Sequence, residues 1–121
     1  MHSSISNPVM GRGIKEFTGT WHIFEMEMWD EDFFNEEVQA YIQINKNGLG
    51  QFQFGYVRGG IDGKAVKYPN GERFEFSWEG ADELDPMSGC GWVKLKDKDE
   101  IEGEFRIHHS DDSMFLARKA K

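Results

Sequence analysis

The sequence predicts an all-β protein, an eight-stranded antiparallel up-and-down meander that closes into a small barrel. Eight short aromatic-rich segments follow one another, and turn residues separate them. Ten Phe, four Trp, three Tyr and 14 Gly, against three Pro, suit pleated half-buried strands joined by tight turns. Closure removes the edge strands that such a meander would otherwise expose.

The chain divides into a tail and one domain. Residues 1–15 are small, polar and aperiodic, so they are predicted to form a flexible N-terminal tail. Residues 16–121 are predicted to form a single β-barrel domain, because 121 residues leave room for one ordinary domain.

Alternation of apolar and polar residues identifies the strands. It is clearest where Phe74, Phe76 and Trp78 share one face, opposite charged and polar neighbours. Turn residues, including Asn47-Gly48 and Gly59-Gly60, mark the boundaries. The predicted strands are 18–29, 39–46, 50–58, 61–67, 72–80, 88–96, 100–109 and 113–119.

Two connections are predicted to be longer than the others, at 30–38 and 81–87. In the first, acidic residues precede Phe33, Phe34 and Val38, which predicts a short helix at about 31–38 whose apolar side closes one mouth of the barrel. An irregular loop is the alternative for this segment.

The first strand has large apolar residues on both faces. Glu25, Glu27 and Trp29 share one face, and Met26 and Met28 share the other. A β-bulge near residues 24–25 would turn both methionines inward. Alternatively, the two glutamates point inward as polar ligand contacts, with the raised pKa values that general acid catalysis uses.

Charge and cysteine content exclude several classes of function. The net charge of −8, from 22 acidic and 14 basic residues, argues against binding nucleic acid or an anionic membrane. A single cysteine, Cys90, excludes an internal disulfide and is expected to be a buried small residue. No cofactor or metal is predicted, because the acids of the 81–87 connection do not match a calcium-binding loop. The N-terminal residues are neither basic nor apolar, so we expect a cytoplasmic protein.

The start of the first strand, Gly19-Thr20-Trp21, resembles the Gly-x-Trp signature of calycins, which are lipocalins, fatty-acid-binding proteins and avidin-like proteins. The resemblance implies that Trp21 closes the barrel base and that Arg118, in the last strand, packs across its indole. The chain as a whole, including the stretches 25–30, 76–80 and 108–113, is also similar to a family of small bacterial proteins of unassigned function.

Three functions are compatible with these features. The leading hypothesis is a non-enzymatic barrel that binds a small, partly apolar ligand. The alternative is a protein-interaction or self-associating domain, such as a homodimer, that uses an acidic, aromatic outer surface. The third is a small enzyme using Glu25, Glu27 or His108, although His108 is also expected to be structural, hydrogen-bonded to a turn acid. The candidate ligand contacts are Glu25, Glu27, Trp29, Tyr56, Trp78 and His108. An open interior would favour the ligand, and a filled interior would favour the surface.

Overall fold

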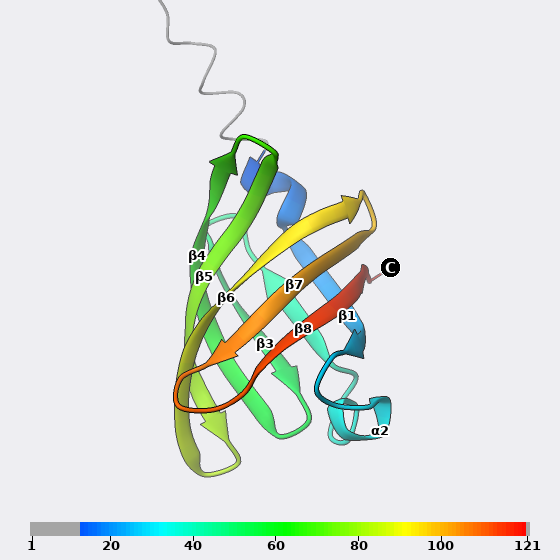
Figure 1. The fold of residues 1–121 in the computed structure, drawn as a ribbon, viewed down its shortest axis with the longest axis vertical. Coiled ribbons are helices and arrows are strands. Elements are labelled where there is room, and N and C mark those ends of the chain that lie inside the picture. Colours follow the sequence, from blue (N-terminus) through cyan, green and yellow to red (C-terminus); the bar gives the residue numbers. More distant parts are fainter. Residues whose placement is uncertain (1–12, 121) are drawn as a thin grey trace, which may run out of the picture.

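The computed structural model describes residues 13–120 and confirms the predicted architecture. Eight antiparallel strands form one closed barrel in which each strand pairs with the next and β8 pairs with β1 (Figure 1). The strands are β1 (Gly19–Met26), β2 (Tyr41–Ile44), β3 (Leu49–Phe54), β4 (Val57–Tyr68), β5 (Gly71–Asp82), β6 (Asp85–Asp97), β7 (Glu100–Ile107) and β8 (Asp112–Lys119).

A helical segment at residues 13–17 precedes β1 and lies at the same end of the barrel as the β4–β5 turn (Figure 1). Ile14 packs against the core and Phe17 is buried within it. Residues 13–15 therefore do not belong to the predicted tail, because this segment presents apolar side chains to the barrel end. Residues 1–12 of that tail lie outside the described residues.

The opposite end carries α2 (Glu31–Phe34), which is shorter than the predicted helix (Figure 1). Asp30 caps its N-terminus by accepting a hydrogen bond from the backbone of Phe33. Phe34 is buried, which agrees with an apolar side closing the mouth. The helix ends at Asn35, whose side chain accepts a backbone hydrogen bond from the following loop. The predicted apolar contact of Val38 is therefore wrong, and this side chain is 45% exposed.

The boundary between β3 and β4 differs from the prediction. Gly59 and Gly60 lie inside β4, and the turn is formed by Gly55 and Tyr56 instead. Gly55 has a φ of 59°, which suits glycine. Gly59 faces a different constraint, since a Cβ there would lie 2.6 Å from the Glu79 carbonyl oxygen and 3.1 Å from the ring of Phe52 on the neighbouring strand.

The predicted 81–87 connection is also wrong. β5 and β6 continue pairing as far as Asp82 and Asp85, so only Glu83 and Leu84 form the turn. Glu83 has a φ of 55°, and Leu84 is 95% exposed at the tip. The local cluster of acids and a proline is typical of a loop, but cross-strand pairing extends through it.

β1 contains the predicted β-bulge, because its register with β8 shifts between Ile23 and Glu25. The bulge turns Met26 into the core and leaves Glu25 and Glu27 at the surface. Met28 follows the end of the strand and is 46% exposed, so its predicted inward position is wrong.

Aromatic rings fill the barrel interior, and glycines face them across the strands. Phe76 pairs with Gly63 on one side and Gly91 on the other, and Trp78 pairs with Gly89. A Cβ on either Gly63 or Gly91 would lie 2.7 Å from an atom of Phe76. The rings contact one another in a continuous cluster, with centroids 4.7 to 6.0 Å apart among Phe52, Phe54, Phe74, Phe76, Phe105, Phe115 and Trp78.

The closure of the barrel base involves a different basic residue from the one the calycin resemblance implies. Lys119 Nζ lies 4.6 Å from the ring centroid of Trp21 and donates a hydrogen bond of 2.8 Å to the Thr18 carbonyl. Arg118 instead lies over Phe24 on the outer surface, at 3.9 Å. The expected position of Arg118 is wrong because Trp21 pairs with Lys119, and neighbouring residues of a strand face opposite sides.

We expect Gly91→Ala to destabilise the protein by about 1–3 kcal/mol, because a Cβ there overlaps Phe76 and the β7 backbone. Gly60→Ala is the matched control, since its Cβ would meet only the Gly50 carbonyl, at 3.8 Å. It should be neutral or stabilising by about 0.4–1 kcal/mol. Urea unfolding measures both, and equal losses would contradict the ring-and-glycine packing.

Lys119→Met should cost about 1–2 kcal/mol, because it removes the contact with Trp21 and a charged hydrogen bond. In a double-mutant cycle with Trp21→Phe, Lys119→Met should be non-additive by at least about 0.5 kcal/mol. Arg118→Met in the same cycle should be additive. Coupling of Arg118 rather than Lys119 to Trp21 would refute this assignment.

Candidate functional site

The candidate ligand contacts do not converge on one site. Trp78 is buried among the interior rings, and its indole N–H donates to the Arg106 carbonyl at 3.3 Å. Trp29 lies at the α2 end, where its ring centroid is 5.6 Å from that of Phe33 and 5.3 Å from that of Phe54. Both tryptophans therefore complete the packing of the barrel and its mouth.

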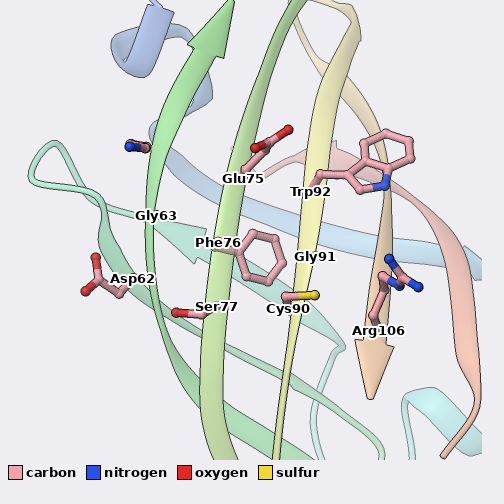
Figure 2. Close-up of a pocket in the computed structure, with 10 residues that line it drawn as sticks. Asp62, Gly63, Glu75, Phe76, Ser77, Cys90, Gly91, Trp92 and Arg106 are labelled. Carbon is pink, nitrogen blue, oxygen red and sulfur yellow. The ribbon is translucent and has the colours of Figure 1, made fainter. Parts of the chain in front are cut away.

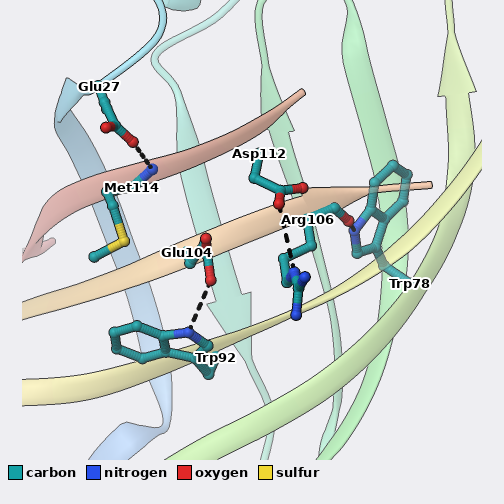
Figure 3. Close-up of polar contacts among 7 residues, drawn as sticks. All are labelled: Glu27, Trp78, Trp92, Glu104, Arg106, Asp112 and Met114. Atoms are coloured by element: carbon teal, nitrogen blue, oxygen red, sulfur yellow. Dashed lines mark hydrogen bonds and ion pairs between the residues drawn. The ribbon is translucent and has the colours of Figure 1, made fainter. Parts of the chain in front are cut away.

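Glu25 and Glu27 face outward, so they are not the desolvated inner pair that general acid catalysis would require. Glu27 links β1 to β8 instead. Its backbone N–H donates to the Met114 carbonyl at 2.9 Å, and its carboxylate accepts from the Met114 N–H at 3.2 Å (Figure 3). This carboxylate extends the closure of the barrel beyond the last residue of β1.

His108 and Tyr56 lie on the surface near the α2 end. His108 follows β7, and its Nδ1 is 3.2 Å from the Ser88 hydroxyl, so its hydrogen-bond partner is not the predicted turn acid. Tyr56 is in the β3–β4 turn, and the nearby Glu36 carboxylate raises the pKa of its phenol. His108 lines a groove with Ser88 and Glu79, and none of the described grooves is lined by Tyr56 or Trp78.

A groove of about 580 Å³ lies on the outer surface of the barrel across β4, β5, β6 and β7. Two cross-strand rows of side chains form this surface, which we call the β4–β7 face. The first row is Asp62, Ser77, Cys90 and Arg106 (Figure 2). The second row, two residues along each strand, is Lys64, Glu75, Trp92 and Glu104.

The groove forms a depression in the outer surface because the side chains at its centre are small. Ser77 and Cys90 pair in the middle of the first row, with Asp62 and Arg106 outside them. Cys90 is only partly buried and faces outward, so its predicted burial is wrong. The interior positions beside it belong to Gly89 and Gly91, which make room for Trp78 and Phe76.

Trp92 lies beside this depression and is contacted on two sides. Its indole N–H donates to Glu104 at 3.2 Å (Figure 3), and the guanidinium of Arg73 lies 4.2 Å from its ring centroid. Arg73 also lies 5.5 Å from the ring of Tyr68, whose hydroxyl bonds to Glu75. Trp92 is therefore preorganised, and Arg73 supplies a cation–π contact on an exposed sheet.

Several charges of the β4–β7 face lack a partner. Within residues 13–120, side-chain ion pairs join Lys94 to Glu102, Lys96 to Glu100 and Arg106 to Asp112. Asp62 and Lys64 have no opposite charge within 4.0 Å among these residues, and neither does Glu79, which lies just outside the face, two residues from Ser77 on β5. Arg106 contacts Asp112 through Nε, at 3.6 Å, so the terminal nitrogens of its guanidinium are left for another acceptor.

The described residues contain no cluster of three or more His, Cys, Asp or Glu side chains that could hold a metal ion. No helix within residues 13–120 is long and apolar enough to span a membrane. The β4–β7 face is suited to binding another molecule by surface contact. It presents one fixed indole, a depression beside that indole, and unpaired charges of both signs.

No family model, curated protein or solved structure matched this chain in the comparisons.

Trp92, Arg73 and Arg106 were missed by the sequence analysis. The strand at 88–96 shows little alternation of apolar and polar residues, because its inward positions include Gly89 and Gly91. The available signal was strand alternation. It places Trp92 on the same face as Ser88 and Cys90, and on the opposite face from Val93. Only the pairing of four strands shows that these residues share one face.

We expect Glu75→Gln to lower the pKa of Tyr68 toward its ordinary value. The hydrogen bond to the Glu75 carboxylate favours the protonated phenol, so the pKa is raised in the folded protein. The stability from this bond is present below the unfolded pKa, about 10, and is lost as the pH rises through the folded pKa. Ultraviolet titration of a Tyr68→Phe difference spectrum measures the shift. Glu72→Gln is the control, and an equal shift there would contradict the assignment.

Proposed function

We propose that this protein is a protein-binding module whose contact surface is the β4–β7 face, with Trp92 as the central anchor. The observation that carries the proposal is the position of Trp92, a half-buried indole fixed on the outside of a sheet by Arg73 and Glu104. Trp, Tyr and Arg dominate binding energy at protein interfaces. Trp92, Tyr68, Arg73 and Arg106 provide all three types on one surface.

The packing of the interior favours this function over a ligand held inside the barrel. The rings of Phe52, Phe76 and Phe105 meet across the interior, with Phe52 and Phe105 centroids 4.7 Å apart. The described grooves of 420, 580 and 790 Å³ are lined by outer-face side chains and by strand backbone. A small ligand inside stays a prediction that would need these rings to move, and rearranging a close-packed core is costly.

Kinship with calycins also belongs to the proposal. It is supported by the closed eight-stranded meander and by the contact between Trp21 at the base and a basic residue of β8, here Lys119. On this proposal the chain uses the outside of such a barrel rather than its centre.

A photo-crosslinking amino acid at Lys64, on the β4–β7 face, should capture a protein in the cells that make this chain. The matched control is the same group at Gln43, on the outer face of β2 and four strands away from β6. Trp92→Ala should remove the Lys64 adduct, because it removes the anchor while leaving the barrel interior intact.

Equal adducts at Lys64 and Gln43, or none at Lys64, would refute the proposed surface. Native mass spectrometry of the purified protein tests the competing function. A constant extra mass of a small molecule, retained in Trp92→Ala, would favour a ligand inside the barrel.

A further inference from the structure

We infer that the partner of the β4–β7 face is a second copy of this chain, and that the two copies insert Trp92 into each other. This inference rests on the proposed function and adds the identity and geometry of the partner. The face carries a projecting side chain, Trp92, directly beside a matching depression. Trp92 lies two residues from Cys90 on β6, and Cys90 and Ser77 form the low centre of the groove.

A two-fold axis makes such a face complementary to itself. If the axis lies between the two copies, perpendicular to the strands and midway between the two rows, each first row lies over the second row of the other copy. Trp92 then lies over Cys90 of the second copy, and Glu75 lies over the Ser77 hydroxyl of the second copy. Both insertions occur together, so a single contact fills both depressions.

The charges agree with the same axis. Asp62 lies over Lys64 of the second copy, and Arg106 lies over Glu104 of the second copy. One step further from the axis, Arg73 lies over Glu79 of the second copy. Each of these pairs has opposite sign and occurs twice. Asp62, Lys64 and Glu79 each have no ion-pair partner within residues 13–120.

The alternative two-fold axis, parallel to the strands, fits the face less well. It also brings two opposite-charge pairs together, Asp62 over Arg106 and Lys64 over Glu104 of the second copy. However, Arg73 then lies over Lys94 of the second copy, which is a like-charge contact. It places Trp92 over Glu75 rather than over a depression, and the two depressions face each other empty. Shape and charge together therefore select the perpendicular axis.

A dimer contact of standard size would cover only part of this chain. A standard interface buries about 800 Å² on each partner, which is roughly a tenth of the 7393 Å² surface of this chain. We expect a dimer that assembles and dissociates within the micromolar range.

Sedimentation of the full chain from about 1 to 300 µM tests the dimer. The mass should rise toward twice 14.0 kDa.

Charge reversal tests the predicted pairing. Lys64→Glu and Asp62→Lys should each weaken association at least about tenfold, because each places like charges opposite one another. Mixing the two variants should restore it, since Glu at position 64 then meets Lys at position 62. Circular dichroism confirms folding, and Lys46→Glu, in the β2–β3 turn, is the control.

The depression and the projection are tested separately. Ser77→Trp fills the depression and Trp92→Ala removes the projection, so each should leave a folded monomer. Modification of the Cys90 thiol by an aromatic disulfide should slow as wild-type concentration rises, because the second copy covers it. In Trp92→Ala the rate should not depend on concentration.

Three results would overturn the inference: a wild-type chain that stays monomeric throughout, single charge variants that remain dimeric, or a mixture that stays monomeric. Such a result combined with a Lys64 adduct to a different protein leaves the proposed surface intact and removes only the second copy as its partner. Absence of any Lys64 adduct, together with a monomeric wild type, removes both.

Discussion

The rest of the structure depends on how aromatic rings and glycines alternate across the interior of the barrel. A barrel of eight strands is narrow, and rings as large as Phe76 and Trp78 fit only where the facing strands carry no side chain. Gly63, Gly89 and Gly91 provide that space. Glycine within a strand costs conformational entropy, and the ring lying over it compensates by covering the bare backbone.

The same packing bears on the proposed function. Among the described residues, the rings of Phe52, Phe76 and Phe105 meet across the centre, which is why the proposed contact surface lies on the outside of the barrel. The outer groove has a separate cause, because its centre is formed by the small outward side chains of Ser77 and Cys90, beside the large outward side chain of Trp92. Large and small residues therefore alternate on both faces of these strands.

Positive and negative charges are distributed unequally over the outer surface, and this distribution affects which partner each face can bind. Residues 16–45 contain eight Asp and Glu and no Lys or Arg, and they form β1, α2 and β2. The β4–β7 face instead mixes both signs at regular cross-strand positions. A surface with one sign would repel a second copy of itself, whereas a mixed surface can be complementary to its own image. This difference favours self-association through β4–β7 rather than through β1 and β2.

The sequence by itself determined the number and order of the strands, because side-chain alternation is local and a break in it shows within a few residues. It showed such a break in β1 but left a bulge and inward glutamates as alternatives, and the register of β1 with β8 decided for the bulge. It did not determine the role of Gly59-Gly60, since a glycine needed for a turn and one needed beneath a ring look alike. It also implied Arg118 in place of Lys119 over Trp21, because a shift of one residue reverses the face. The surface around Trp92 was decided only by tertiary structure, for Asp62, Ser77, Cys90 and Arg106 come from four strands and become neighbours only through the cross-strand register.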